Sequence, residues 1–120
     1  MKNISITILG RPASKKNNRR NFGKVSLPSL AYEKFRETAL WQLKIVKDRF
    51  DTPVFIDYHF YQKGRLSQDS DNAQASINDV LQEAGIISDD TLITEGHFKK
   101  SGGYKDWSTT VEIKQLLETV

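Results

Sequence analysis

Acidic side chains without basic partners dominate one stretch of this 120-residue chain. Between Leu66 and Phe98 there are seven carboxylates and no Lys or Arg, although the whole chain has a formal net charge of +3. Carboxylates that crowd together repel one another unless a cation lies between them. A divalent metal is such a cation, and ligands that offer only oxygen favour Mg²⁺ or a similarly hard ion. The seven residues are Asp69, Asp71, Asp79, Glu83, Asp89, Asp90 and Glu95.

The spacing of these acids indicates how they could converge. If residues 65–71 form the end of a strand, Asp69 and Asp71 project to the same face, because strand side chains alternate and each residue advances ~3.3 Å. Apolar residues at helical spacing predict a helix over 72–84, which the following glycine would stop. If a further strand lies beside the first one, it returns the pair Asp89-Asp90 to the same place.

Each acidic pair also has a simpler interpretation. Asp69 just before a helix fits an ordinary N-cap, since Asp and Asn accept hydrogen bonds from the exposed N–H groups of the first helical turn. The Asp89-Asp90 pair likewise fits a solvated turn. The metal-site hypothesis requires both pairs to meet in space, and it leaves open whether one or two ions bind.

Length and composition indicate a single soluble domain that spans residues 1–120. No apolar run approaches the ~20 residues that a transmembrane helix requires, and the first residues lack the charged-then-apolar pattern of a signal peptide. The chain has no cysteine, which rules out disulfides, thiolate nucleophiles and cysteine zinc sites. We therefore expect a cytoplasmic protein without a membrane partner.

Positive charge is concentrated in the first half of the chain. Residues 1–50 carry twelve Lys and Arg against three acids, whereas residues 51–120 carry six against twelve. The stretch from residue 11 to residue 24 holds six cations and no acid. A solvated charge run is one interpretation, but phosphate binding better explains so many cations without partners. The predicted DNA-binding residues are Arg11, Lys15, Lys16, Asn17, Arg19, Arg20 and Lys24.

The remaining pattern predicts an α+β domain in the order β-α-β-α-β-β, with one mixed sheet and helices packed on it. Strands are expected over 3–9 and over 54–61, the latter central because both of its faces are partly apolar. A helix is expected to start at 26–29, with an apolar stripe that Trp41 widens. The last two strands, over 91–99 and 108–113, are predicted to form a hairpin with a basic, glycine-rich tip at 100–105. His59 and His97 are expected to be ordinary strand residues.

With these elements in place, the chain resembles the RusA family of Holliday junction resolvases. The residues that carry the resemblance are Gly10-Arg11-Pro12, Ser14-Lys15-Lys16-Asn17, Arg19-Arg20, Ala31-Tyr32, Asp69-Ser70-Asp71-Asn72, Asp79-Val80-Leu81, Ala84-Gly85 and Ser88-Asp89-Asp90. The resemblance implies a homodimeric, Mg²⁺-dependent endonuclease, in which Mn²⁺ would substitute for Mg²⁺, that cuts opposed strands of a four-way DNA junction. It assigns Asp69, Asp71 and Asp90 as catalytic carboxylates and metal ligands. The metal would activate a water molecule for in-line attack on the phosphodiester.

The sequence departs from the family pattern at one position. The family has a catalytic lysine four residues after the second aspartate, and that position is Ala75 here. Loss of one charge-stabilising group commonly costs ~10²–10³ in rate. Either another cation substitutes, with Lys63, Arg65, Lys15 and Lys16 as candidates, or the protein binds junctions and cuts them slowly. The alternative function is a non-catalytic binder of branched or single-stranded DNA, in which Tyr104 and Trp107 stack on bases. A structural protein without a nucleic-acid role is the third hypothesis.

Overall fold

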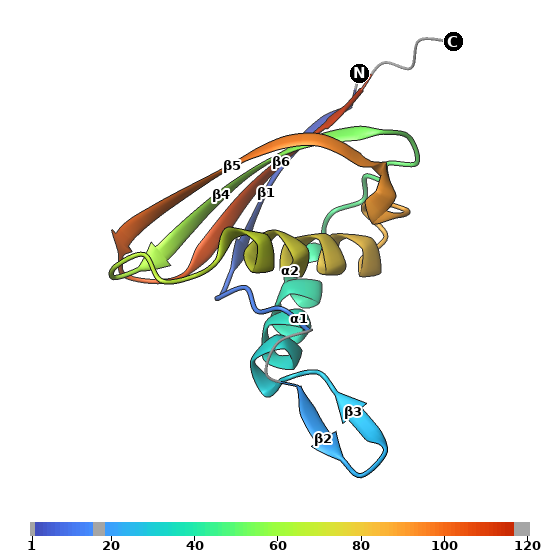
Figure 1. Ribbon diagram of the computed structural model, residues 1–120. Coiled ribbons are helices and arrows are strands. Elements are labelled where there is room, and N and C mark those ends of the chain that lie inside the picture. Colours follow the sequence, from blue (N-terminus) through green and yellow to red (C-terminus); the bar gives the residue numbers. More distant parts are fainter. Residues whose placement is uncertain (1, 16–18, 117–120) are drawn as a thin grey trace.

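The protein is built on a four-stranded mixed sheet, shown in a computed structural model that describes residues 2–15 and 19–116 (Figure 1). The strands are β1 (Asn3–Leu9), β4 (Val54–Lys63), β5 (Ile93–Tyr104) and β6 (Ser108–Gln115), in the spatial order β1-β6-β4-β5. The β1–β6 and β6–β4 pairs are antiparallel, and β4–β5 is parallel. The predicted α+β class, the mixed sheet and the inner position of β4 are confirmed.

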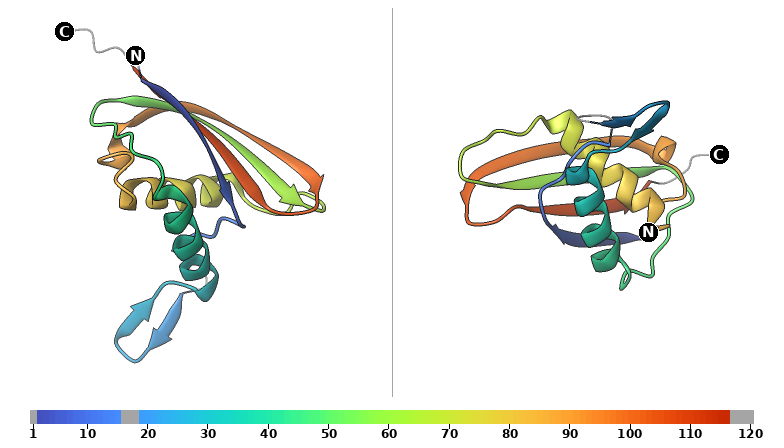
Figure 2. Two further views of the ribbon diagram at one scale, coloured as in Figure 1. Left: turned by 180° about the vertical axis from the view of Figure 1, so that it is seen from behind. Right: turned by 90° about the horizontal axis from the view of Figure 1, so that it is seen from below.

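Two helices, α1 (Leu30–Leu43) and α2 (Ser70–Glu83), lie on the same side of this sheet and leave its other face uncovered (Figures 1 and 2). Alternate residues of β4 are buried against them, because strand side chains point to opposite faces in turn. The predicted stripe of α1 packs into this core, with Ser29 as the N-cap. Trp41 was expected to widen the stripe, but it is 71% exposed on the far side of the helix. No helix in the described residues is long and apolar enough to cross a membrane.

The basic stretch after β1 was expected to be a flexible loop, but part of it is a β-hairpin. Strands β2 (Arg20–Phe22) and β3 (Val25–Leu27) pair antiparallel, and the hairpin projects beyond the start of α1 (Figure 1). The tight turn uses Gly23, whose φ of 61° is easy for glycine and strained for other residues. Phe22 and Val25 are 59% and 55% exposed on this hairpin.

The last two strands do not form the predicted hairpin. Strand β4 lies between β5 and β6, since it pairs with both of them. Strand β5 also continues through the glycine-rich segment that was expected to be the tip, and it ends only at Tyr104. Proximity in sequence suggested that β5 and β6 pair directly. A hairpin would need β6 beside β5, but the strand beside β5 is β4, which runs parallel to it.

The parallel unit β4–α2–β5 sets the positions of the acidic residues. Helix α2 carries the chain back along the sheet and ends before Gly85, which adopts the left-handed conformation expected of a helix stop. A short 3₁₀ turn, η1 (Asp90–Leu92), then leads into β5. Because β5 runs parallel to β4, its first residue, Ile93, pairs with Val54 at the start of β4. The start of β5 and the end of β4 therefore lie at opposite ends of these two neighbouring strands.

Candidate active site

The acidic motif stands at the beginning of α2. Asp69 is the N-cap, and its Oδ1 accepts hydrogen bonds from the backbone N–H of Asp71 at 2.7 Å and of Asn72 at 3.4 Å. Asp71 lies in the first helical turn and is exposed. The predicted strand over 65–71 is wrong, because β4 ends at Lys63 and the helix begins at Ser70. The N-cap interpretation is therefore correct for Asp69. Asp69 and Asp71 lie close together because both are at the start of α2, and not because strand side chains alternate.

A polar cluster fixes the segment in front of this motif. The side chain of Gln62 is fully buried at the end of β4, and its Oε1 accepts the backbone N–H of Ser67 at 3.0 Å and of Gln68 at 3.5 Å. The Gln68 amide in turn donates to the carbonyl of Pro12. Buried polar groups stay in place when they are hydrogen-bonded, so these contacts hold the approach to Asp69 against the chain that follows β1.

Asp90 lies at the other end of the helix. Its backbone N–H donates to Gln82 Oε1 at 3.0 Å, and Gln82 comes eleven residues after Asp71. Its neighbour Asp89 caps the 3₁₀ turn through a 2.9 Å hydrogen bond from the Thr91 N–H. That N–H, together with the Thr91 hydroxyl, lowers the pKa of Asp89. The solvated-turn interpretation thus fits the Asp89-Asp90 pair.

The structure does not bring the three predicted carboxylates together within one chain. The eleven residues of helix from Asp71 to Gln82, which binds the Asp90 backbone, span about 16 Å at 1.5 Å per residue. In the described part of the chain no group of three or more His, Cys, Asp or Glu is placed to hold a metal ion. The expectation that Asp90 returns to Asp69 failed because the neighbouring strands are parallel: α2 separates the end of the first from the start of the second.

Two of the three carboxylates still suit magnesium by donor type. Mg²⁺ commonly takes only one or two protein carboxylates and completes its shell with water and substrate phosphate oxygens. Asp69 and Asp71, at one helix end, offer such a pair. Asp90 does not fit this set within a single chain.

The motif borders a groove that also contains positive charge. This groove has a volume of about 740 Å³ and lies between the segment after β1, the first half of α1 and the start of α2. Arg11 and Lys34 line it together with Asp69 and Asn72. Arg11 is also stacked at 4.6 Å over the ring of Trp107, which leaves its guanidinium edge for hydrogen bonding. Two cations and the Asp69 carboxylate therefore face one space.

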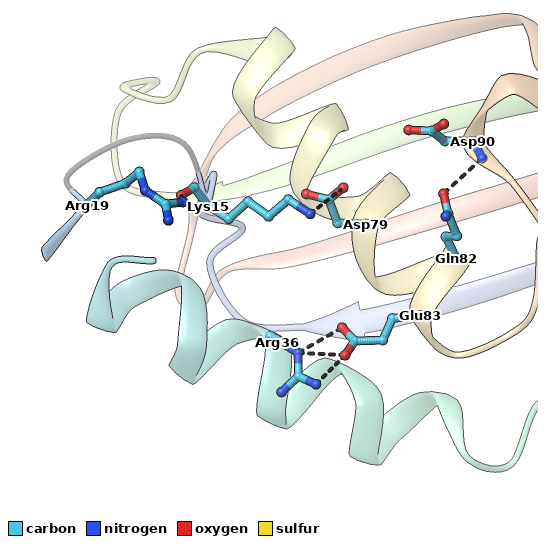
Figure 3. Close-up of polar contacts among 7 residues, drawn as sticks. All are labelled: Lys15, Arg19, Arg36, Asp79, Gln82, Glu83 and Asp90. Atoms are coloured by element: carbon cyan, nitrogen blue, oxygen red, sulfur yellow. Dashed lines mark hydrogen bonds and ion pairs between the residues drawn. The ribbon is translucent and has the colours of Figure 1, made fainter. Parts of the chain in front are cut away.

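A second groove, of about 870 Å³, runs between α1 and the later turns of α2. Figure 3 shows its charged residues: Lys15 Nζ lies 3.7 Å from Asp79 Oδ1, and Arg36 forms a two-pronged ion pair with Glu83. Burial, then the charges of Asp79 and Glu83, raises the pKa of the Tyr32 hydroxyl in this groove. Asp90 lines the groove as well.

A smaller groove, of about 310 Å³, connects Asp90 with the sheet. It is lined by Gln74 and Asn78 of α2 and by Tyr58 of β4. The Tyr58 hydroxyl donates to Asn78 Oδ1 at 2.6 Å, and burial raises the pKa of Tyr58 to about 12. Positions 71, 74, 78 and 82 recur at helical spacing, so Asp71 and Asp90 mark two ends of one helix face.

The predicted DNA-binding cations divide into structural and available groups. The Arg19 guanidinium bonds to Ser26 and to the carbonyl of Lys15, and Arg20 pairs with Glu33 at 2.8 Å. These arginines hold the hairpin and its junction with α1. Lys24 is exposed at the hairpin turn. Lys16 and Asn17 lie outside the described residues. The argument that all six cations lack partners was wrong, because acids distant in sequence neutralise some of them.

Sequence reasoning missed two groups near the motif, Lys34 and Lys100. Lys34 of α1 lines the groove together with Asp69. Lys100 of β5 donates from Nζ to the Gln68 carbonyl at 3.2 Å. A parallel β4–β5 pairing would have predicted this contact, because it puts Lys100 beside Phe60, near the end of β4.

Comparison with known proteins agrees with the resemblance seen in the sequence. No protein-family model matches the chain. A crossover junction endodeoxyribonuclease RusA from Aquifex aeolicus (strain VF5) is 31% identical over 104 residues, which cover 83% of this chain and 82% of that protein. Identity of this size over most of both chains shows common descent, and the α+β domain agrees with it. The chain belongs to the RusA family of crossover junction endodeoxyribonucleases.

Proposed function

We propose that this protein is a Mg²⁺-dependent endodeoxyribonuclease of the cytoplasm that resolves four-way DNA junctions by paired nicks. The observation that carries the proposal is the groove at the start of α2, where Arg11 and Lys34 face the same space as Asp69. A nuclease must hold a negatively charged backbone while it directs acidic groups at one phosphate. Two cations and the Asp69 carboxylate in a single groove, with Asp71 in the first helical turn, support that role.

In this proposal the residues have different tasks. Arg11 and Lys34 bind phosphates on either side of the cut, with Lys15 and Lys24 extending the contact along the DNA. Asp69 and Asp71 form the catalytic pair. Bound Mg²⁺, or Mn²⁺ in its place, supplies an activated water and neutralises phosphate oxygens. Asp90 acts on the same DNA strand from the far end of the helix face, through the groove that it shares with Asn78.

The proposal includes a homodimer. A four-way junction has near two-fold symmetry, so a two-fold dimer presents one active site to each of two equivalent strands. The exposed apolar side chains of the β2–β3 hairpin, Phe22 and Val25, together with Leu30 at 65% exposure, provide apolar surface for a second copy of the chain to cover. Light scattering on purified protein tests this: a dimer mass that Phe22→Ser shifts toward the monomer supports it, and a monomer at all concentrations refutes it.

A cleavage assay tests the catalytic proposal. Purified protein is incubated with a synthetic four-way junction, the matching duplex and single strands, in Mg²⁺ and in EDTA. We expect paired nicks in the junction with Mg²⁺ only, and loss of nicking with retained binding in Asp71→Asn. The matched control is Asp48→Asn, an exposed acid in the loop after α1, which should cut like the wild type. Mg²⁺-dependent cutting by Asp71→Asn would refute the site assignment.

The second candidate function is a non-catalytic binder of branched or single-stranded DNA. Two observations favour it: Ala75 occupies the family's lysine position, and Asp90 is separated from the other two acids in the chain. Tyr104 is 46% exposed and lies edge-on to Tyr61, so its ring is available to stack on a base. A junction gel shift without nicks in Mg²⁺ or Mn²⁺ would favour this function over the nuclease.

A further inference from the structure

A cation that is hydrogen-bonded directly beside the acidic motif comes from β5 rather than from α2. Lys100 Nζ donates a 3.2 Å hydrogen bond to the carbonyl of Gln68, the residue directly before Asp69. Within residues 2–15 and 19–116, Lys100 is the basic residue that hydrogen-bonds to the stretch 67–72. Of the substitutes named from the sequence, Lys15 instead pairs with Asp79, two helical turns beyond Asp71.

The β4–β5 register explains how Lys100 reaches this place. Lys100 pairs with Phe60, which is buried under the helices. Paired residues of neighbouring strands point to the same face, so Lys100 lies on the helix side of the sheet. Its neighbour Lys99 pairs with His59 and points to the uncovered side. The parallel arrangement that takes Asp90 away from the motif thus delivers Lys100 to it.

The ammonium group is held in a defined position. Its acceptor, the Gln68 carbonyl, belongs to a segment that Gln62 and Pro12 fix through hydrogen bonds. A lysine ammonium carries three donors, and the contact with Gln68 uses one of them. Lys100 is half-buried, and partial burial reduces screening of its charge by water. A positive charge fixed in advance stabilises negative charge that develops during a reaction, without reorganisation at that moment.

We propose that Lys100 is a catalytic residue of this nuclease, whose ammonium group contacts the phosphate being cut and stabilises the charge that develops on its oxygens. The inference rests on the proposed function. Lys100 of β5 would supply the charge that a lysine at position 75 would supply from α2. Position 75 is one turn after Asp71 on the same helix face. Ala75 is exposed, so a lysine side chain there has room to reach the motif.

The test compares single-turnover nicking of a four-way junction by the wild type and by Lys100→Met, which keeps the side-chain length and removes the charge. We expect Lys100→Met to cut about 10²–10³-fold more slowly, with junction binding by gel shift within threefold of the wild type. Lys100→Arg should cut at about a tenth of the wild-type rate or faster. Lys99→Met is the matched control, because it removes a neighbouring charge on the other face, and it should cut normally.

The decisive variant is Ala75→Lys combined with Lys100→Met. If a lysine on α2 restores cutting to within tenfold of the wild type, the group lost in Lys100→Met is a charge at the motif. A lysine on α2 would not repair packing around β5. Circular dichroism melting shows whether each variant is folded. If Lys100→Met melts early, the same comparison is made with Lys100→Gln, which retains a donor for the Gln68 carbonyl.

Three outcomes overturn the inference, and they can be distinguished. A wild type that cuts, with a folded Lys100→Met or Lys100→Gln that cuts within threefold of it, removes the role of Lys100 and leaves the nuclease proposal intact. If Ala75→Lys with Lys100→Met cuts as slowly as Lys100→Met alone, the catalytic role of Lys100 is also refuted. Lys100 would then act through the structure of β5. A wild type that leaves the junction whole in Mg²⁺ and Mn²⁺ overturns the proposed function and the lysine's role with it.

Discussion

The separation of Asp71 and Asp90 predicts how their substitutions combine. Asp71→Asn and Asp90→Asn are each expected to slow junction cutting, and the structure sets the coupling between them. Asp90 is hydrogen-bonded to Gln82, which lies on the order of 15 Å along α2 from Asp71. Two unit charges at that distance interact by about 0.3 kcal/mol in water and about 1 kcal/mol at an effective dielectric constant of 20. The direct coupling is therefore at most about fivefold in rate.

The assay is a double-mutant cycle in single-turnover nicking, with each variant measured in the same excess of protein over junction. We expect the loss in the double variant to equal the product of the two single losses, within about fivefold. Asp69→Asn with Asp71→Asn is the matched comparison. These two residues share a hydrogen bond at one helix end, so their double variant should be little worse than either single one.

A double variant of Asp71 and Asp90 that cuts no more slowly than Asp71→Asn alone would refute this reasoning. Groups that act as one unit lose their function at the first substitution, and further substitutions then cost little. That result would mean that Asp90 joins the other two acids during the reaction, through a second copy of the chain or a movement of the 3₁₀ turn. It would also require a new account of how α2 separates them.

Three further predictions concern binding, folding and pH. Lys34→Ala should weaken junction binding in gel shifts and reduce the slope of log K against log salt by about 0.9, because one phosphate contact is lost. Gly96→Ala should lower the free energy of unfolding in urea by about 1–3 kcal/mol, because a Cβ there would lie 2.1 Å from the Ile56 carbonyl oxygen. The pKa of Tyr58 is raised from 10.0 to about 12, so its stabilising contribution is complete below pH 10 and is lost as the pH rises toward 12. Urea unfolding of the wild type should show a loss of free energy of unfolding of about 2–3 kcal/mol across that range, and Tyr58→Phe should remove this loss.

Each of these has a result that would contradict it. An unchanged salt slope in Lys34→Ala would show that this lysine does not reach the DNA backbone. Gly96→Ala that unfolds at the wild-type urea concentration would mean that β4 and β5 are not packed in this register. Equal alkaline losses in the wild type and Tyr58→Phe would show that the Tyr58 hydroxyl is not buried with Asn78.

Most of the fold was predictable because local signals decide it. The alternation of apolar residues in β4, the Ser29 cap of α1 and the glycine that ends α2 each act within a few residues. Strand pairing is not local. The placement of β4 between β5 and β6 depends on burial of both faces of one strand and on the crossover through α2, and adjacency in sequence suggested a hairpin instead.

The site was predictable in its residue types but not in its geometry. The acidic motif and the basic segment are visible as charge patterns, and the family resemblance gave them a function. Whether Asp90 meets Asp71 depends on the relative direction of two strands, which no short pattern reports. The contact between Lys100 and Gln68 depends on the same direction. The pairing of Arg20 with Glu33 arises from a hairpin that the charge pattern alone did not indicate.

Helix α2 acts as a spacer, and its length has a consequence for the DNA that this protein accepts. Inserting one whole turn would move the two acidic positions apart while both stayed on one side, whereas inserting two residues would rotate one of them by about 200° out of line. Substrate geometry would then be set by the number of residues in a helix, and a relative with a longer or shorter helix would address a differently spaced strand.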